Sequence, residues 1–256
     1  MLSTKRHEKI LAIIQERKTV TTAELQKLVY ASHSTIIRDL TELEKTGLIK
    51  RIHGGASILV PKDTESSFTI RVNTNIDEKN AITNIASEFI ENGSTIFIDS
   101  SSTLQTLVPH LKKFKYLTVI TNGLNSAMLI SKNTDINIFF LGGQISANSN
   151  STIGCLALSN SENFNTDLAF FSASGISGNT ICEHNIEQAA IKKAMIKRAN
   201  KSILLCDSSK FGVKSQSTFA GFNDIDYFIT DATPTKEIFQ AIDNSHCKLI
   251  IAKPTK

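Results

Sequence analysis

SHSTIIRDL, at residues 32–40, decides the fold of the first part of the chain. Ser32 is a good N-cap, and from it a helix is predicted to run to about Lys45. On that helix Ile36, Leu40 and Leu43 form an apolar stripe at i, i+4, i+7, the spacing of one buried face. The opposite face carries hydroxyl and guanidinium groups, which donate hydrogen bonds to phosphates and to base edges.

Two shorter helical patterns precede this stretch. Residues 5–17 place Ile10 and Ile14 on one face and charged residues elsewhere, as in a surface helix. Thr21 and Glu24 have the spacing of a capping box and open a second, short helix. The sequence therefore predicts three helices joined by short turns.

A hairpin pattern follows the third helix, which we expect to end at Gly47. Residues 48–59, LIKRIHGGASIL, read as two strands around the pair Gly54 and Gly55, with cations on the first arm. Three helices followed by such a hairpin predict a winged helix-turn-helix, whose third helix enters the major groove of DNA. A small helical domain for protein contact, with merely solvated charges, is the alternative.

The predicted DNA contacts come from the second helix start, the exposed side of the third helix and the hairpin. These DNA-binding residues are Thr21, Thr22, Ser32, His33, Ser34, Thr35, Ile37, Arg38, Thr41, Lys50, Arg51, His53, Gly54 and Gly55. The distribution of charge supports DNA binding by this part of the chain. Residues 1–60 hold ten Lys/Arg against six Asp/Glu, and the rest of the chain holds eighteen of each. The whole net charge of +4 thus lies in the first quarter, which favours a polyanionic partner.

Composition bounds the class of protein. Of the 256 residues 41% are apolar and 20% charged, which excludes a disordered chain. Apolar stretches such as residues 136–141 are far shorter than the ~20 residues that span a bilayer, and residues 1–8 lack the apolar core of a signal peptide. The four cysteines stand apart with no Cys-x-x-Cys. We expect a cytoplasmic protein with no membrane contact, metal or cofactor.

A polar segment at residues 61–67, PKDTESS, divides the chain. We expect a DNA-binding domain over residues 1–58, a linker over 59–75 and an α/β domain over 76–253. Within the linker, residues 68–75 read as a strand or loop.

The pattern after residue 76 alternates between helices and short apolar runs. The predicted helices are residues 79–91, 103–112 and 187–199. The apolar runs are residues 95–98, 117–120, 136–141, 168–171, 203–205, 227–229 and 249–251. This alternation indicates βαβ units and a mainly parallel, Rossmann-like sheet.

Small polar residues follow several of these runs. Ligands bind at the carboxyl ends of parallel strands, so we expect a shared polar pocket there. Residues 99–103, DSSST, open a helix with hydroxyls and N–H groups that suit a phosphate, although ordinary capping is the alternative. The predicted effector-binding residues are Asp99, Ser100, Ser101, Ser102, Thr103, Asn122, Gly123, Gly142, Gly143, Ser174, Gly175, Glu187, Asp207 and Lys210.

Lys210 places a positive charge at this edge of the sheet. An anionic ligand would lie beside it. An ion pair with Asp207, three residues earlier, is the alternative, and the two interpretations are compatible.

These motifs resemble the DeoR family of bacterial transcription regulators. The similarity lies in residues 32–40, Leu43 and Glu44, and the wing IHGGA at 52–56. Where the family has two consecutive arginines, this chain has Ile37 and Arg38. Ile37 borders the apolar stripe, so it packs inward or touches a thymine methyl.

The second domain also resembles this family, whose sensor half is related to ribose-5-phosphate isomerase and glucosamine-6-phosphate deaminase. Residues 99–103 resemble the family's Asp-x-Gly-Thr-Thr loop, with serines where glycine is usual, and residues 121–123 resemble its Thr-Asn-Ser. Residues 141–143, 173–176 and 207–212 match the family closely. The resemblance covers residues 3–252.

The resemblance implies a repressor of a carbohydrate-use operon that binds double-stranded operator DNA as a homo-oligomer, a dimer or tetramer. It also implies a phosphorylated sugar as effector. At the strand ends, we then expect Asp99, Asn122 and Asp207 to hold the hydroxyls of that sugar.

A sugar-phosphate isomerase or deaminase is the competing class. Proton shuttling between sugar carbons needs a carboxylate, and residues 172–177 contain none. Glu183, His184 and Glu187 follow within reach. We expect no catalytic residue. An inactive sugar-phosphate binding protein, whose N-terminal module contacts protein, is a further alternative.

Overall fold

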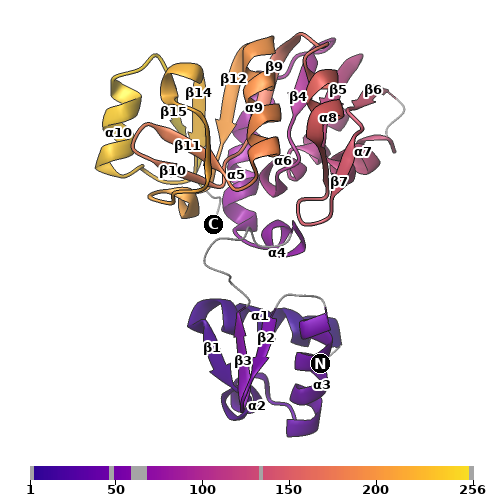
Figure 1. The fold of residues 1–256 in the computed structure, drawn as a ribbon, viewed down its shortest axis with the longest axis vertical. Coiled ribbons are helices and arrows are strands. Elements are labelled where there is room, and N and C mark those ends of the chain that lie inside the picture. Colours follow the sequence, from indigo (N-terminus) through magenta and orange to yellow (C-terminus); the bar gives the residue numbers. More distant parts are fainter. Residues whose placement is uncertain (1–2, 46–48, 59–67, 133–134, 254–256) are drawn as a thin grey trace. The chain divides into compact units, whose positions relative to one another are not determined.

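The computed structural model describes residues 3–45, 49–58, 68–132 and 135–253, and the chain divides into two compact units, Met1–Thr64 and Glu65–Lys256 (Figure 1). The expected helix end at Gly47 and the expected polar segment at 61–67 lie outside the described residues. Among the helices described, none is long and apolar enough to cross a membrane.

The first unit is a winged helix-turn-helix, as predicted. Its helices and strands are α1 (Ser3–Arg17), β1 (Thr19–Thr21), α2 (Thr22–Val29), α3 (His33–Lys45), β2 (Ile49–Ile52) and β3 (Gly55–Ile58). Strand β3 lies between β1 and β2 and pairs antiparallel with both.

Local sequence signals set the starts of α2 and α3. The Thr21 hydroxyl accepts a hydrogen bond from Glu24 N at 3.2 Å, and the Glu24 carboxylate accepts one from Thr21 N at 2.8 Å, so the predicted capping box is confirmed. The Ser32 hydroxyl likewise accepts from Thr35 N at 3.3 Å. The apolar stripe of α3 is buried in a core that contains Ile10, Ile14, Leu25, Ile36, Leu40 and Leu43.

Strand β1 was not predicted, because a three-residue strand carries no run of its own. The two glycines of the hairpin have different roles. Gly54 has a φ of +78° in the two-residue turn between β2 and β3. At Gly55 a Cβ atom would overlap the carbonyl oxygen of Val20, so only glycine lets β1 lie so close to β3.

The second unit is built on a seven-stranded parallel sheet with the order β15-β14-β12-β9-β4-β5-β6. Its strands are β4 (Thr95–Ile98), β5 (Leu117–Thr121), β6 (Ile136–Phe140), β9 (Thr166–Phe171), β12 (Ala199–Leu205), β14 (Tyr227–Thr230) and β15 (Lys248–Ile251). Each of the seven predicted apolar runs lies in one of these strands, so the predicted α/β sheet is confirmed.

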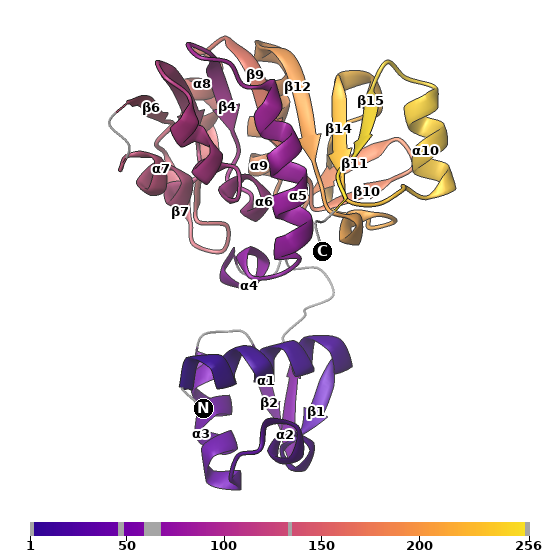
Figure 2. The same ribbon diagram turned by 180° about the vertical axis from the view of Figure 1, so that it is seen from behind.

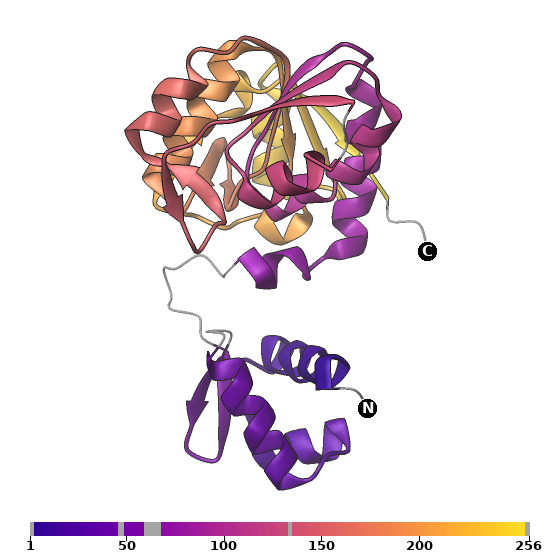
Figure 3. The ribbon, with the colours of Figure 1, turned by 90° about the vertical axis from the view of Figure 1, so that its right-hand side faces the viewer.

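Helices cover both faces of this sheet (Figures 2 and 3, where α5 is purple and α9 orange). One face packs against α5 (Ile76–Ala86), α6 (Ser102–Gln105) and α7 (Leu124–Ile130). The other packs against α8 (Gly154–Ser161), α9 (Ile186–Arg198) and α10 (Lys236–Asp243). Because successive strand residues alternate between faces, Phe97 joins the second core while Ile96 and Ile98 join the first.

Two predictions about helices need correction. Residues 68–75 were expected as a strand or loop, but Phe68–Val72 form helix α4, whose Phe68 is buried. The helix expected over 103–112 is instead α6 followed by the 3-10 helix η2 (Val108–Lys113), because Pro109 cannot continue an α-helical hydrogen-bond ladder. The predicted helix at 79–91 is α5 followed by the 3-10 helix η1 (Ser87–Phe89).

Several short elements complete this unit. They are the hairpin β7 (Gln144–Ser146) and β8 (Ser151–Ile153), the strands β10 (Gly175–Ser177), β11 (Thr180–Glu183) and β13 (Ser217–Ala220), and the 3-10 helices η3 (Ser208–Lys210) and η4 (Phe222–Asp224). The three strands form a separate antiparallel sheet.

Candidate functional site

Helix α3 presents the polar face that the sequence predicted. His33, Ser34 and Arg38 are exposed on it, and Thr35 and Thr41 are half-buried. Ile37 is half-buried at the border of the stripe, so part of its side chain packs inward. The arrangement leaves Arg38 free to reach a base edge or a phosphate.

Hydroxyl groups cluster at the start of α3. The Ser32 hydroxyl lies 3.1 Å from that of Ser34 and 2.9 Å from that of Thr35. Such groups and the first N–H groups of a helix are common phosphate contacts.

The wing is attached to the helices by side-chain contacts. Arg51 Nη1 donates to the Thr41 hydroxyl at 3.1 Å, and Arg51 N donates to the Glu44 carboxylate at 2.9 Å. At the hairpin turn, Thr22 N donates to the Gly54 carbonyl at 2.9 Å. Lys50, Arg51 and His53 are exposed, whereas Gly55 is buried in the sheet and supports the hairpin.

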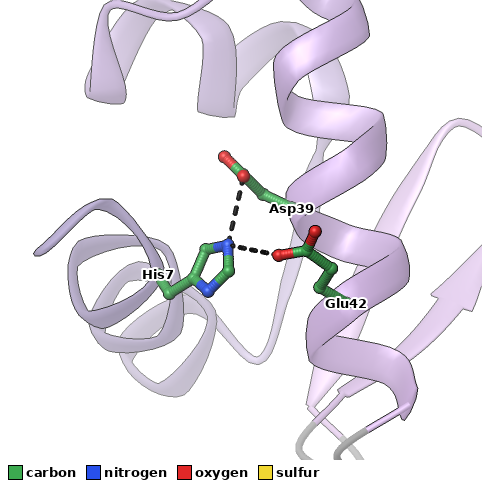
Figure 4. Close-up of side chains that lie close together, drawn as sticks. All are labelled: His7, Asp39 and Glu42. Carbon is green, nitrogen blue, oxygen red and sulfur yellow. Dashed lines mark hydrogen bonds and ion pairs between the residues drawn. The ribbon is translucent and has the colours of Figure 1, made fainter. Parts of the chain in front are cut away.

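A buried carboxylate joins α1 to α3 (Figure 4). Asp39 is fully buried and accepts hydrogen bonds from Arg6 Nε at 2.5 Å and Nη2 at 3.0 Å. His7 Nε2 lies 3.1 Å from Asp39 Oδ1 and 3.5 Å from Glu42 Oε2. Burial alone would raise the pKa of Asp39, but the hydrogen bonds from Arg6 and His7 outweigh it and lower that pKa.

His7, Asp39 and Glu42 are close enough to share a cation, with their ligand atoms within 4.8 Å of one another. Arg6 already neutralises Asp39, however, so the cluster serves to fix α3 against α1. The sequence signal for it is an acid between Ile36 and Leu40 on the apolar stripe.

In the second unit a cavity of about 130 Å³ opens at the carboxyl edge of the sheet, where the strand-end rule placed it. Seven predicted effector residues line it, namely Ser100, Ser101, Ser102, Thr103, Ser174, Asp207 and Lys210. Ser101 also caps α6, since its hydroxyl accepts from Leu104 N at 3.3 Å. Because α6 is only four residues long, its dipole adds little, and the charge of the pocket comes from side chains.

The remaining lining residues were not predicted as effector-binding. They are Arg71, Thr74, Asn75, Lys79, Ser149, Ser172, Ala173, Glu183, His184, Gln188, Lys192 and Ser209. One feature of the sequence could have identified some of them: a polar residue on the otherwise apolar face of a helix. Gln188 and Lys192, spaced i, i+4, lie beside Met195 on the buried face of α9, and Lys79 lies beside Ile82 on α5.

Lys192 is the centre of a buried charge network. Its Nζ pairs with the Glu183 carboxylate, lies 3.2 Å from Asp99 Oδ2 and donates to the Ser172 carbonyl at 2.8 Å. Burial disfavours its charged form, but the carboxylates of Glu183 and Asp99 outweigh burial and raise the pKa of Lys192. The ammonium of Lys192 therefore stays charged at neutral pH.

Lys79 lies across the pocket and is also buried. Its Nζ donates to the carbonyl oxygens of Arg71 and Thr74, the latter at 2.7 Å, and to the Ser102 hydroxyl at 3.2 Å. Desolvation lowers the pKa of Lys79 to about 8, although the nearby Asp207 opposes the shift.

Asp207 is held by Asn75 Nδ2 at 2.8 Å and by Ser209 N at 3.1 Å. Burial raises its pKa, but the hydrogen bond from Ser209 and the charge of Lys210 outweigh burial and lower it. Both of the interpretations of Lys210 therefore remain predictions, since it lines the pocket and also acts on Asp207.

Seven predicted effector residues lie outside the lining: Asp99, Asn122, Gly123, Gly142, Gly143, Gly175 and Glu187. Asp99 binds Ser101 N at 2.8 Å and Ser172 N at 2.9 Å, and so shapes the pocket from behind. Asn122 Nδ2 donates to Gln188 at 3.1 Å.

Three of the four glycines among these residues lie where another backbone comes close, whereas a Cβ atom at Gly142 would meet no atom within 4 Å. A Cβ atom at Gly123 would lie 3.0 Å from Ser100 Cα, one at Gly143 would lie 2.8 Å from the Ile153 carbonyl oxygen, and one at Gly175 would overlap the Val213 carbonyl oxygen. Close backbone approach, which also suits a ligand, explains these glycines without one.

Comparison with known proteins agrees with this architecture. The DeoR-like helix-turn-helix domain matches residues 6–62, and the DeoR C terminal sensor domain matches residues 74–232. The transcriptional regulator GolR of Listeria innocua is 34% identical over 99% of this chain and 100% of its own length. The glycerol-3-phosphate regulon repressor of Escherichia coli is 31% identical over 97% and 99%.

Among solved structures, ribose 5-phosphate isomerase A from Methanocaldococcus jannaschii matches with a TM-score of 0.40 and 18% identity, over 54% of this chain and 55% of that one. The two family models match both units, and the two regulators align along almost the whole chain, so the family membership is clear. The chain belongs to the DeoR family of helix-turn-helix transcriptional regulators.

Proposed function

We propose that the protein is a repressor of a carbohydrate-use operon, that its first unit binds operator DNA, and that the cavity of its second unit binds a phosphorylated sugar. The observation that carries this proposal is the cavity itself, in which Lys79, Lys192 and Lys210 stand among serine and threonine hydroxyls. The E. coli relative is named for a regulon of a phosphorylated metabolite, which supports the ligand class.

Charge favours an anionic group at one end of this cavity. Lys192 is neutralised by Glu183 and Asp99, whereas Lys79 lies near two further cations, Lys210 and Arg71, as well as near the carboxylates of Asp207 and Glu78. A phosphate would interact favourably with this group of cations. The serine hydroxyls suit a polyol at the other end.

An effector can regulate only if it binds the two states of the regulator with different affinities. Fluorescence anisotropy on the DNA upstream of the protein's own gene should therefore show operator affinity that changes with ribose 5-phosphate, glucosamine 6-phosphate or glycerol 3-phosphate. The unphosphorylated compounds are the controls. Equal operator affinity with and without every phosphorylated compound would contradict the effector assignment.

Catalysis is the second candidate, because Glu183, His184 and Lys192 line the cavity. A general base needs a free oxygen and a pKa near neutrality. Glu183 meets neither condition, since Ser174, His184 N and Lys192 occupy its oxygens and, despite burial, lower its pKa. We therefore propose binding without turnover, and substantial conversion of pentose or hexosamine phosphates by purified protein would overturn that.

Arg38→Ala should weaken operator binding by about 1–3 kcal/mol, if the guanidinium contacts guanine in a bidentate manner. Arg38 is exposed on the groove-facing side of α3, two residues from the buried Ile36. Anisotropy titrations against operator and scrambled DNA measure the effect and its sequence dependence.

Lys50→Ala is the comparison variant, because a wing contact to phosphate weakens all sequences together and reduces the salt slope by about one unit. If Arg38→Ala binds the operator with unchanged affinity, Arg38 does not lie in the interface.

Oligomerisation is expected because one winged helix reads only a few base pairs and operators are commonly bound by symmetric dimers. Sedimentation velocity of the full chain at micromolar concentration should show a dimer or tetramer. A monomer that retains full operator affinity would contradict this expectation.

Lys210→Ala should weaken effector affinity by more than about tenfold, since a charge-assisted hydrogen bond contributes about 1.5–3 kcal/mol. Lys214→Ala is the matched control, because Lys214 is exposed and lies outside the lining. Isothermal titration with the effector found above measures both. Wild-type affinity with a lowered Tm would instead identify Lys210 as a structural partner of Asp207.

A further inference from the structure

One wall of the cavity is formed by the segment that leads into it from the DNA-binding unit. Arg71, Thr74 and Asn75 line the cavity, and they belong to α4 and the turn that follows it. We call residues 71–75 the strap. α4 is the first element that the structure describes after residue 58.

The strap is held by polar contacts to residues of the cavity. Lys79 Nζ donates to two of its carbonyl oxygens, those of Arg71 and Thr74, and to the Ser102 hydroxyl on the opposite side. Asn75 has a left-handed backbone with φ of +53°, and its Nδ2 donates to Asp207. The strap is thus joined to one lining residue, Asp207, through the Asn75 side chain and to another, Lys79, through its backbone carbonyls.

We infer that the effector acts on DNA affinity through the strap, and that Lys79 is the residue that links the bound anion to it. The inference rests on the function proposed above. It adds the segment through which ligand binding would change DNA affinity. An ammonium group has three hydrogens, and the structure commits all three to the strap and Ser102.

The electrostatics of Lys79 explain why a ligand would change this linkage. Lys79 is 4% exposed. The carboxylates of Asp207 and Glu78 favour its charged form, and the cations Lys210 and Arg71 disfavour it. A phosphate beside Ser102 would add negative charge within reach of this ammonium and stabilise its charged form. A fully protonated Nζ keeps three donors for the two strap carbonyls and the Ser102 hydroxyl, so anion binding should order the strap.

The strap also has few apolar side chains to bury, since among residues 71–75 only Val72 is apolar and it is half-buried. α4 is five residues long, and Phe68 is its buried residue. Phe68 N donates to the Asn148 carbonyl at 3.0 Å. An element with few buried apolar contacts opens at low free energy, which suits a segment that moves between two states.

Hydrogen–deuterium exchange of the full chain tests this with inorganic phosphate as the probe. In the wild type, saturating phosphate should slow amide exchange in residues 68–75 by roughly fivefold or more, at the lower end of common coupling factors. Lys79→Met should lose this slowing. Lys112→Met, an exposed lysine of the same unit, is the control and should keep it.

A second variant guards against a failure of Lys79→Met to fold. Asn75→Gly keeps the left-handed backbone without strain and removes only the amide that binds Asp207. It should reduce the phosphate-dependent slowing, whereas Tyr116→Gly, at another left-handed position that is exposed, should not.

The outcomes separate the inference from the proposed function. Phosphate could slow amide exchange at Ser101–Thr103 but not at residues 68–75, or it could slow exchange in Lys79→Met as much as in the wild type. Either result would contradict the role of the strap and would still support the anion site. Absence of any phosphate effect at either place would contradict the proposed site itself. With an effector identified, the ratio of operator Kd values with and without it should fall to within about twofold of one in Lys79→Met.

Discussion

Lys192→Met is expected to lower the free energy of unfolding of the second unit by about 3–5 kcal/mol. The side chain of Lys192 is 4% exposed and lies between the carboxylates of Glu183 and Asp99. Without the ammonium, two buried negative charges face each other, and both desolvation and repulsion oppose the folded state. For a unit of this size the loss corresponds to a fall in Tm of roughly 6–20 °C.

Two further variants separate charge from side-chain volume. Lys193→Met removes the neighbouring lysine of α9, which is exposed, and should leave the Tm within about 2 °C of wild type. Glu183→Gln combined with Lys192→Met should recover part of the loss, because Asp99 keeps its hydrogen bonds from Ser101 N and Ser172 N. Calorimetry of the full chain measures all three. Equal Tm values for Lys192→Met and Lys193→Met would show that the network is not stabilising.

The sheet of the second unit was predictable because its strands are buried on both faces. Such strands read as continuous apolar runs, and each of the seven runs proved to be a strand. Strands β1, β7 and β8 carry no such run, since they are three residues long and polar or mixed. Strand β1 forms by pairing with the distant β3, and β7 and β8 pair with each other in a short hairpin, so none of the three depends on a continuous apolar run.

The place of the cavity was predictable, but only seven of its nineteen lining residues were predicted as effector-binding. The rule that ligands lie at the carboxyl ends of strands located Ser100–Thr103, Ser174, Asp207 and Lys210. It could not locate Lys79, Glu183 or Lys192, which reach the same cavity from helices α5 and α9 and from the small sheet. Their meeting depends on how helices pack on the sheet, and that is a property of the assembled fold.

Three of the predicted glycines have a second explanation, and their role as ligand contacts stays a prediction. Gly123, Gly143 and Gly175 follow strands and look like ligand contacts in the sequence, yet each lies where another backbone comes close. A glycine that admits a ligand and a glycine that admits a neighbouring chain have the same sequence signal, because both positions exclude a Cβ atom. Only the positions of the neighbouring atoms distinguish the two.

Asp39→Ala is expected to destabilise the DNA-binding unit by about 3–5 kcal/mol and to weaken operator binding at 37 °C. Asp39 is fully buried on α3 and His7 of α1 lies close to it (Figure 4), and Arg6 of α1 also donates to its carboxylate. Its removal takes away the carboxylate that accepts two hydrogen bonds from the Arg6 guanidinium, which is 12% exposed. A unit of this size has roughly 5 kcal/mol of stability in total, so a loss at the upper end of this range would unfold about half of the population.

Glu42→Ala is the matched control within the same cluster. Its side chain is 52% exposed and lies 3.5 Å from His7 Nε2, so its loss should change stability by no more than about 1 kcal/mol. The pKa of Asp39 is lowered in the folded unit, so its stabilising contribution is present at neutral pH and is lost as pH falls below the unfolded value of about 3.9. Thermal melting at pH 7, followed by circular dichroism, with operator titration compares the two variants. If Asp39→Ala matched Glu42→Ala in both measurements, α3 would be held by its apolar stripe alone, and the acid on that stripe would have no structural role.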